Sequence, residues 1–468
     1  MAPPTPQHHA LANTQHKVFW LDHPDAPATT PPLAETLCTD LLIIGAGFTG
    51  LWAALQAAKA NPGRRIVILE AKTAAIGASG RNGGFCDALI THGLDNGFSH
   101  WPNEMPTLVR LGNENLAGLC ADVAAHNIDC QLEAAGEMGV AVEPWQLEAL
   151  AEEAEAWTKL GASVELLDTH QVRQNVNSPT YLGGLMRRHD VVMVNPAQLA
   201  WGLRAATQHL GVTIYENSPV TQLSRSGTGV QAVTPQGKIT ADKVVVATNA
   251  FPNPVRSARR SIIPVYDHVL MTEPLSSAQM TSIGWEGRQG MADAGNQFHY
   301  YRLTADNRIL WGGWDALYHF NNGMKPGAEH NPNTSNLLAQ HFFTTFPQLE
   351  GLNFTHQWAG PIGTTTRFSC AWDTSHQGRV AWAAGYTGMG VGASRFGAQV
   401  ALDLVDGQTT ERTELKMVRK RPVPFPPEPV RWLGVQATRA ALQRSDRRQG
   451  RRGPWLKTLD KFGIGFNS

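Results

Sequence analysis

The stretch from residue 40 to residue 70 constrains the fold of this chain more than any other segment. It reads DLLIIGAGFTGLWAALQAAKANPGRRIVILE, so two short apolar runs flank a glycine-rich turn and a helical pattern. The landmarks in order are the apolar run 41–44, the glycines Gly45, Gly47 and Gly50 in G-x-G-x-x-G spacing, a helical pattern from Leu51, the apolar run 66–69 and the acid Glu70. This order of strand, turn, helix, strand and acid predicts a dinucleotide-binding βαβ unit.

Each part of this motif has a physical task at a bound dinucleotide. Gly45 permits the tight turn, and Gly47 lets a pyrophosphate approach the backbone. Gly50, with Ala54 one turn later, allows close packing of the helix on the strand. The free N–H groups at the helix N-terminus attract phosphate, and Glu70 is placed to accept hydrogen bonds from a ribose hydroxyl pair. A glycine-rich turn in an ordinary βαβ unit is the alternative interpretation.

The overall composition excludes several classes of protein. A chain of 468 residues is long enough for two domains, and its 39 basic residues balance 39 acidic ones, so no net charge favours nucleic acid. The five cysteines are scattered without a C-x-x-C pair, which indicates neither disulfides nor a metal site and fits a reduced, cytoplasmic setting. No apolar run approaches the ~20 residues of a membrane-spanning helix. The first residues have no signal-peptide pattern, so we expect a flexible lead that continues into an irregular arm.

Two further glycine-rich segments have the composition of ligand-binding loops. The loop GASGRNGGF follows the second strand directly and holds more glycines than a turn needs, which suits a backbone that lies along an extended ligand. Near the other end of the chain, the strand pattern 380–384 leads into four glycines and a helix to Val405. Between them, VVVATNA at 244–250 is typical of a buried parallel strand whose carboxyl end faces a ligand.

The order of these segments predicts a chain that visits one nucleotide-binding domain three times. Residues 262–320 differ from these segments, because apolar and polar residues alternate in them and aromatic residues are frequent. They also contain a hairpin pattern with an Asp306-Asn307 turn, which indicates an antiparallel sheet facing a cavity. The predicted fold class is α/β, with a discontinuous Rossmann-type domain plus an α+β substrate domain that has a large antiparallel sheet. The assigned bounds are 36–98, 193–262 and 355–408 for the nucleotide-binding domain, 99–192 and 263–354 for the substrate domain, 1–35 for the N-terminal arm and 409–468 for a basic C-terminal extension.

The C-terminal extension is basic and interrupted by prolines. A helical segment over about 428–448 carries Trp432, Leu433, Val435 and Leu442 among five arginines. Such a helix either contacts a membrane surface or a partner, or it docks on the protein's own surface with its arginines solvated. We favour docking on the protein itself.

Taken together, these motifs resemble the FAD-dependent amine and amino-acid oxidoreductases of the D-amino acid oxidase (DAO) superfamily. The segments GAGFTG…LE, GASGRNGGF, VVVATNA, YYRLTADNRILWGG, WAGPIG and GYTGMGVGASRFG are similar, in the same order, to the gamma-glutamylputrescine oxidoreductase-like branch. The resemblance extends over about residues 18–461. It implies an oxidoreductase with a Rossmann-type FAD-binding domain, a substrate domain and a flavin bound non-covalently in extended form.

The resemblance also implies which residues bind FAD. Those around the first glycine turn would hold the pyrophosphate, Glu70 the adenosine ribose, and the backbone of Val220 the adenine. The last glycine cluster would lie at the flavin pyrimidine, where a second helix N-terminus stabilises the negative charge of the reduced ring. The full implied set is Gly45, Gly47, Phe48, Thr49, Gly50, Glu70, Ala71, Ser79, Gly80, Arg81, Asn82, Gly83, Gly84, Val220, Ala247, Thr248, Asn249, Gly385, Gly388, Met389 and Gly390.

The implied reaction is the oxidation of a C–N bond in a polar amine or amino acid. A C–H bond next to nitrogen gives a hydride to flavin N5, and the resulting imine hydrolyses to a carbonyl product. The candidate substrate contacts are Tyr300, Arg302, His268 and Trp358. Arg302 resembles the position at which amino-acid-oxidising relatives hold a carboxylate, with a structural ion pair as its alternative role. His268 and Trp358 are more typical of cavity walls, and only one of Tyr300 and Tyr301 can face the cavity.

The sequence departs from such relatives after WAGPIG, where TTTRFSC stands in place of a T-x-D-x-x-P stretch. Arg367 in this segment either faces a substrate carboxylate or lies at the surface. Cys370 does not fall where a sarcosine-oxidase-type cysteine tethers flavin, so we expect no covalent link. The electron acceptor is either oxygen or a quinone. A nicotinamide-dependent dehydrogenase and a non-catalytic flavoprotein subunit remain alternative functions.

Overall fold

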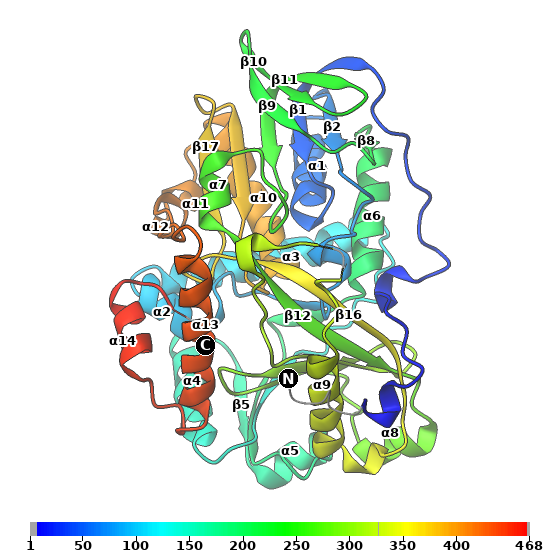
Figure 1. The fold of residues 1–468 in the computed structure, drawn as a ribbon, viewed down its shortest axis with the longest axis vertical. Coiled ribbons are helices and arrows are strands. Elements are labelled where there is room, and N and C mark those ends of the chain that lie inside the picture. Colours follow the sequence, from blue (N-terminus) through cyan, green and yellow to red (C-terminus); the bar gives the residue numbers. More distant parts are fainter. Residues whose placement is uncertain (1–6, 326, 466–468) are drawn as a thin grey trace.

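Two eight-stranded sheets form the frame of the molecule. The computed structural model describes residues 7–325 and 327–465. In Figure 1 the first sheet occupies the upper half, with strand order β17-β18-β11-β1-β2-β8 and with β10 and β9 added beside β11. The second sheet lies below it, in the order β16-β12-β15-β14-β13-β4-β6-β5, and β3 and β7 form a separate pair.

The first sheet is the nucleotide-binding sheet that the sequence predicts. Its strands are β1 (Thr36–Ile44), β2 (Ile66–Leu69), β8 (Thr213–Tyr215), β9 (Gln222–Ser226), β10 (Gly229–Val233), β11 (Lys238–Val246), β17 (Ala371–Ser375) and β18 (Val380–Ala384). The central strands β18, β11, β1, β2 and β8 run parallel. Every residue of β2 and β18 is buried, as expected for parallel strands covered on both faces. The strand predicted at 244–250 is the last part of a longer strand, β11, which begins at Lys238 and ends at Val246.

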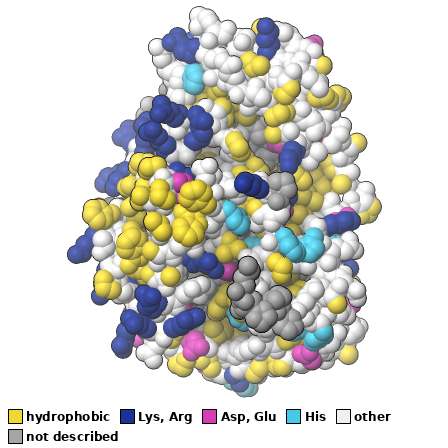
Figure 2. Space-filling view, in the orientation of Figure 1, with side chains coloured by type: hydrophobic (Ala, Val, Ile, Leu, Met, Phe, Trp, Pro, Cys, Tyr) yellow, Lys and Arg dark blue, Asp and Glu magenta, His cyan; other side chains and the backbone are white. Residues whose placement is uncertain are grey.

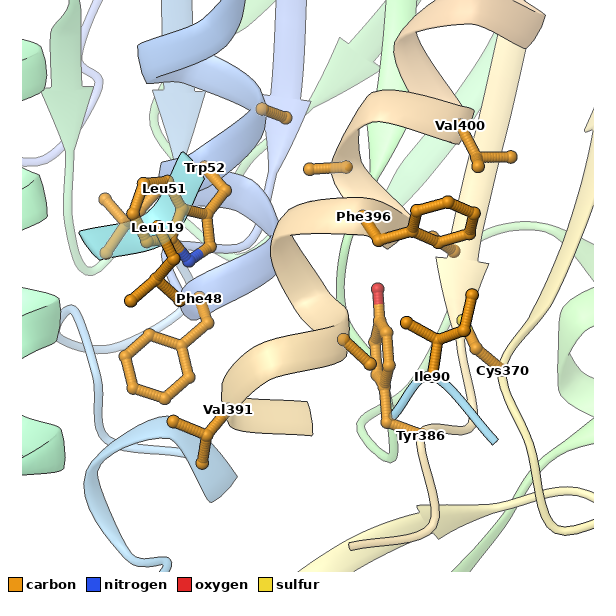
Figure 3. Close-up of a cluster of buried hydrophobic side chains, with 14 of the residues drawn as sticks. Phe48, Leu51, Trp52, Ile90, Leu119, Cys370, Tyr386, Val391, Phe396 and Val400 are labelled. Carbon is orange, nitrogen blue, oxygen red and sulfur yellow. The ribbon is translucent and has the colours of Figure 1, made fainter. Parts of the chain in front are cut away.

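Helices α1 (Phe48–Ala60) and α10 (Gly390–Asp406) pack side by side against this sheet. Figure 3 shows the cluster around them, in which Phe48 of α1 lies beside Val391 of α10, Trp52 lies beside Leu119, and Phe396 lies near Tyr386. Because both helices follow a glycine-rich turn at the carboxyl end of a strand, their packing brings the two N-termini to the same edge of the sheet.

The second sheet is antiparallel apart from the parallel pair β13–β4. Its strands are β4 (Glu137–Ala141), β5 (Val164–Leu167), β6 (Gly183–Arg187), β12 (Ile263–Thr272), β13 (Gly290–Asp293), β14 (His299–Leu303), β15 (Ile309–Gly313) and β16 (Phe354–Thr364). The predicted hairpin is confirmed, with its turn at Asp306-Asn307 between β14 and β15. Tyr301 and Trp311 point into a core against helix α9 (Pro332–Thr345), so the opposite face of the sheet is turned toward the first sheet.

The remaining elements cover the two sheets. They are α2 (Gly93–His100), α3 (Met105–Ala125), α4 (Gln146–Lys159), α5 (Thr169–Asn175), α6 (Pro196–His209), α7 (Arg256–Ser261), α8 (Ser277–Ile283), α11 (Glu411–Glu414), α12 (Lys416–Arg419), α13 (Val430–Asp446), α14 (Pro454–Lys461), β3 (Phe85–Asp87) and β7 (Val191–Met193). The Asn195 side chain caps α6, because it accepts a hydrogen bond from the Gln198 N–H at 3.2 Å.

Two expectations about chain organisation need correction. Strand β16 pairs along its length with β12, so the first part of the segment 355–408 belongs to the second sheet rather than to the nucleotide-binding sheet. The flexible lead is wrong for the residues that the structure describes, because Ala10 and Leu11 are buried in the second core; residues 1–6 lie outside the description. In the described part of the chain no helix has the length and apolarity needed to cross a bilayer.

Candidate active site

One cavity of about 1000 Å³ contains most of the residues singled out by sequence. Its wall is formed by the carboxyl ends of strands in the first sheet, by one face of the second sheet and by the C-terminal extension. Both Gly47 of the first glycine turn and Gly388 of the last one line it. Ligands in open α/β sheets bind at the carboxyl ends of strands, so the position matches the expected nucleotide site.

The first glycine turn leaves no room for side chains. Gly45 has a φ of +108°, and a Cβ added there would lie 2.8 Å from the carbonyl oxygen of Ala247. A Cβ at Gly50 would lie 1.9 Å from the carbonyl oxygen of Gly45. Gly45 is therefore required by its left-handed backbone and Gly50 by the close approach of helix α1 to the turn.

The N-termini of α1 and α10 both open into the cavity. The N-cap residues Gly47 and Met389 line it, and neither supplies a side-chain cap to its helix. The hydroxyl of Ser79 accepts a hydrogen bond from the Phe48 N–H at 2.8 Å, which leaves further N–H groups of the first turn of α1 for a ligand. Two uncapped helix starts in one cavity form a favourable environment for the negative charges of a dinucleotide.

Glu70 fixes the turn from the end of β2. Its carboxylate accepts hydrogen bonds from the N–H groups of Ala46 at 2.8 Å and Lys72 at 2.9 Å. Burial raises the pKa of Glu70, and the two N–H donors partly oppose that shift. The side chain lines the cavity while it is held by the backbone, so its orientation is set before any ribose arrives.

The loop GASGRNGGF is held in shape by its own side chains and by the second sheet. The Asn82 amide donates to the carbonyl oxygen of Ala78 at 2.9 Å and accepts from the Gly84 N–H at 2.8 Å. The Arg81 guanidinium donates to the carboxylate of Glu329 at 2.6 Å and to the carbonyl oxygen of Ala359 at 2.9 Å. The loop therefore connects the two sheets along the cavity wall.

The end of β11, next to the first glycine turn, offers polar groups that fit a dinucleotide. The hydroxyl oxygen of Thr248 is buried, lines the cavity and has no hydrogen-bond partner within the described residues. The neighbouring Asn249 side chain accepts from the Gly385 N–H at 2.8 Å, which ties the end of β11 to the last glycine cluster. A buried hydroxyl without a partner together with two uncapped helix starts fits an extended dinucleotide such as FAD.

Most of the implied FAD-binding residues line this cavity. Those that line it are Gly45, Gly47, Phe48, Thr49, Glu70, Ala71, Ser79, Arg81, Asn82, Gly83, Val220, Ala247, Thr248, Asn249, Gly388, Met389 and Gly390. The other four implied positions, Gly50, Gly80, Gly84 and Gly385, lie outside the lining and shape the backbone behind it. At Gly84, for example, φ is +81° and a Cβ would lie 2.1 Å from the carbonyl oxygen of Val194.

Of the four candidate substrate contacts, the structure brings only Tyr300 to the cavity. Arg302 lies on the same face of β14 but beneath the Gly84 loop, where its guanidinium donates to the carbonyl oxygens of Val194 at 2.8 Å and Leu303 at 3.0 Å. Burial lowers the pKa of Arg302 to about 10. Its partners are main-chain carbonyls. Arg302 therefore has neither of its two predicted roles, which were to bind a substrate carboxylate or to form a structural ion pair.

His268 and Trp358 are buried beside the cavity without lining it. His268 follows Asp267 on β12, and because successive side chains of a strand alternate, it points away when Asp267 points in. Burial lowers the pKa of His268 to about 4, which keeps the ring neutral. The Trp358 indole donates to the carbonyl oxygen of Arg81 at 2.8 Å and so supports the GASGRNGGF loop from behind.

Asp267 is one of several polar cavity residues that sequence reasoning missed; others are Asp87, Glu137 and Asp315. It lines the cavity, and its carboxylate accepts a hydrogen bond from the hydroxyl of Tyr300. Burial raises the pKa of Asp267 to about 6 and raises the pKa of Tyr300 well above its usual value. A signal was present in the sequence, because Asp267 is the one acid in the otherwise mostly apolar strand IPVYDHVLMT.

The C-terminal extension closes one side of the cavity. Helix α13 contributes Val430, Arg431, Gly434, Val435, Thr438, Arg439, Leu442 and Gln443 to the wall. The Arg439 Nε donates to the Asp315 carboxylate at 2.9 Å, and the Asp446 carboxylate accepts from the Asn296 side chain at 2.6 Å. The expected docking of this helix on the protein is therefore observed, although only one of its faces is covered.

Arg367 neither faces the cavity, where it could bind a substrate carboxylate, nor lies at the surface. It is buried outside the cavity lining, and its guanidinium donates to the carbonyl oxygens of Lys420 at 2.6 Å and Cys370. It therefore ties the segment after β16 to the start of the C-terminal extension. Cys370 is also buried and lies outside the lining.

Comparison with known proteins identifies the family. The model of the family described as FAD dependent oxidoreductase (DAO) matches residues 40–404. This chain belongs to that family. It is therefore an FAD-dependent oxidoreductase, and the C-terminal extension lies beyond the matched residues.

Individual relatives agree with this assignment. The gamma-glutamylputrescine oxidoreductase of Escherichia coli (strain K12) is 32% identical over 386 residues, which are 80% of this chain and 85% of the relative. The probable oxidoreductase OrdL of Haemophilus influenzae is 28% identical over 83% of this chain and 88% of its own length. The fold is similar to that of glycine oxidase from Geobacillus kaustophilus, with a TM-score of 0.67, 20% identity and coverage of 83% of this chain and 100% of the other.

Proposed function

We propose that this FAD-dependent oxidoreductase oxidises the C–N bond of a polar amine or amino acid to an imine, which water hydrolyses to a carbonyl product. The observation that carries the proposal is the Tyr300–Asp267 pair, because it places a buried carboxylate in the same cavity as the FAD cradle. A carboxylate held in this way is an acceptor for an amine N–H. The similarity to gamma-glutamylputrescine oxidoreductase supports an amine substrate.

In this proposal FAD bound along the glycine turns supplies the two-electron acceptor. The substrate loses a hydride from carbon and a proton from nitrogen, so that the C–N single bond becomes C=N. Asp267 is ionised above about pH 6 and therefore accepts the N–H of the substrate and is positioned to take its proton. Tyr300 donates to that carboxylate and fixes its orientation.

The second sheet and helix α13 complete the substrate site in this proposal. Gln297 and Trp314 on the loops of the second sheet face the cavity together with Arg431 of α13. These groups surround the substrate and exclude bulk water, which strengthens the polar contacts inside. The same proposal includes the FAD-binding residues that line the cavity and the division of the chain into an FAD-binding and a substrate domain. It also includes a non-covalently bound flavin, with oxygen or a quinone as the electron acceptor.

Anaerobic bleaching of the flavin tests the reaction. The FAD-loaded protein is mixed without oxygen with a panel of gamma-glutamylated amines, short alkylamines, N-methyl amines and amino acids. We expect the visible absorption of oxidised flavin to disappear with at least one class and to return when oxygen or a quinone is added.

Two outcomes contradict the proposal. If dithionite bleaches the flavin but no member of the panel does, the chain is a non-catalytic flavoprotein subunit. If the protein takes up no flavin and exchanges a hydride with a nicotinamide nucleotide instead, the chain is a nicotinamide-dependent dehydrogenase and the proposal is wrong.

A further inference from the structure

Exposed hydrophobic side chains gather on the C-terminal extension. Six of the twelve large hydrophobic residues that are exposed in the described chain lie in its last sixty residues. These six, called the apolar patch below, are Val423, Val430, Trp432, Leu433, Trp455 and Phe462, of which Val430 and Trp455 also line the cavity. Figure 2 shows a hydrophobic area over α13 and its surroundings. Scattered exposed apolar residues are ordinary, but a concentration of this kind indicates an interaction surface.

Basic residues surround the apolar patch. Residues 409–468 hold fourteen Lys and Arg against five Asp and Glu, although the whole chain is balanced at 39 of each. The exposed members are Lys416, Arg419, Lys420, Arg421, Arg444, Arg447, Arg448, Arg451, Lys457 and Lys461. In Figure 2 dark blue side chains border the hydrophobic area above and below.

Helix α13 has a different chemistry on each of its two faces. Val435, Thr438 and Leu442 line the cavity, whereas Leu433, Ala437 and Ala440 lie on the outward side and are exposed. The helix is fixed at both ends, because Glu428 accepts from the Asn321 N–H at 3.0 Å and Asp446 accepts from the Gln297 N–H at 2.9 Å. The outward apolar face is therefore presented by an anchored helix.

We propose that the apolar patch docks on an anionic lipid bilayer. Aliphatic and indole side chains in the centre of a basic surface are suited to the boundary between acyl chains and headgroups, and each Lys or Arg near an anionic surface adds about 1 kcal/mol of attraction. A second copy of this chain would bring two strongly basic surfaces together, which charge repulsion opposes. The lipid surface therefore fits both the apolar centre and the charge around it.

Docking would bring the bilayer to the outer face of the helix that closes the cavity. An α-helix with its side chains is about 10–12 Å across, so the membrane would lie about one helix diameter from the cavity. A lipid-soluble reactant would then approach the cavity from the bilayer. The docking itself does not depend on the proposed amine reaction.

Vesicle co-sedimentation of the full-length, FAD-loaded protein tests the proposal. We expect binding to vesicles of phosphatidylcholine with phosphatidylglycerol to be at least about tenfold tighter than to phosphatidylcholine alone, and to weaken as salt is raised. Replacing Trp432 and Leu433 together by Glu is expected to abolish the sedimentation. Changing Arg447 and Arg448 together to Gln is expected to weaken it while binding to neutral vesicles stays the same.

Leu166→Glu provides the matched control, because Leu166 on β5 is 51% exposed and Leu433 is 57% exposed. Flavin absorption and circular dichroism verify that each variant is folded. The proposal is overturned if the wild-type protein ignores anionic vesicles or if Leu166→Glu reduces binding as much as the patch variant does. Light scattering that shows a dimer dissociated by the patch variant also overturns it, in favour of a second copy as the occupant.

Discussion

At the scale of single residues, alternation along β12 and β14 decides which side chains reach the cavity. Asp267 and Tyr300 point into it, whereas His268 and Tyr301 point away. The two inward residues meet through the hydrogen bond from the Tyr300 hydroxyl to the Asp267 carboxylate. Burial leaves this carboxylate with a pKa near neutrality, a common property of groups that exchange protons with substrates.

The first prediction compares two adjacent tyrosines. Tyr300→Phe removes the donor to Asp267, so we expect kcat/KM for the best amine to fall by about 10- to 100-fold, because hydrogen bonds to charged groups contribute about 1.5–3 kcal/mol. Tyr301→Phe is the control, since that hydroxyl is also buried but contacts Tyr181 at 2.7 Å in the other core. Steady-state kinetics of both variants measure the difference; equal losses would remove Tyr300 from the site.

The second prediction concerns pH. The pKa of Asp267 is raised by burial to about 6, so a fall in pH through 6 protonates the carboxylate and removes the acceptor for the substrate amine. We expect kcat/KM to decrease on the acid side of about pH 6. Asp267→Asn should lower activity and abolish the acid limb of the pH profile without loss of flavin absorption. The control variant Asp306→Asn, on the hairpin turn, should retain the acid limb. An unchanged limb in Asp267→Asn would assign the titration to another group.

The third prediction treats Arg302 as structural. Arg302→Met leaves the buried carbonyl oxygen of Val194 without its donor, so we expect the free energy of unfolding to fall by about 1–3 kcal/mol. The KM for an amino acid should remain within about twofold in the folded fraction, because the guanidinium does not line the cavity. Denaturant unfolding and kinetics on the same preparation measure both. A large rise in KM with normal stability would restore the carboxylate-binding role.

The sequence could not distinguish these roles for Arg302. The period-two pattern of β14 correctly separates Tyr300 from Tyr301, and it puts Arg302 on the inward face as well. What removes Arg302 from the cavity is the backbone of Gly84 and Val194, which covers it. That cover comes from segments more than a hundred residues away, so local periodicity contains no information about it.

At the scale of elements, the helix starts of α1 and α10 define the nucleotide site. Each is left without a side-chain cap at the cavity, and their packing through Phe48, Val391 and their neighbours holds the two ends together (Figure 3). These two elements were predictable, because the glycine spacing and the flanking apolar runs specify strand, turn and helix locally. The antiparallel hairpin of the second sheet was equally readable from its alternation and turn.

The fourth prediction tests the contact between α1 and its turn. Gly50→Ala would place a Cβ 1.9 Å from the carbonyl oxygen of Gly45, so the helix must move away from the turn. We expect this variant to be purified without flavin absorption and to bind added FAD at least about tenfold more weakly, which corresponds to about 1.4 kcal/mol. Gly63→Ala, just beyond α1 where the nearest atom is 3.5 Å away, should bind FAD normally. Normal FAD binding by Gly50→Ala would show that the close approach is dispensable.

At the scale of the whole molecule, the cavity joins parts of the chain that are distant in sequence. The nucleotide turns, the second sheet and the C-terminal extension all contribute to one wall. The extension was recognised as a basic helix, but its docking depends on single contacts such as Arg439 with Asp315, between residues 124 positions apart. Pattern and propensity do not specify such a pairing, so the closed side of the cavity became visible only in the structure.

The fifth prediction follows from the proposed site, in which FAD contacts both sheets. FAD that binds the folded chain alone stabilises it by mass action, by about 2.7 kcal/mol when the free concentration is one hundred times Kd. We therefore expect removal of FAD to lower Tm and its return to restore Tm, with a single transition in differential scanning calorimetry. The same concentration of NAD should leave Tm unchanged. Stabilisation by NAD in place of FAD would contradict the assignment of the cavity.

The wall supplied by α13 has an evolutionary consequence. Because α13 lies after residue 404, where the match to the family model ends, substitutions there change one wall of the cavity without altering the glycine turns of the first sheet. Evolution can therefore change which reactants enter the cavity while the FAD-binding fold stays the same. Exchanging only the C-terminal extension between homologous enzymes therefore offers protein engineers a way to change specificity.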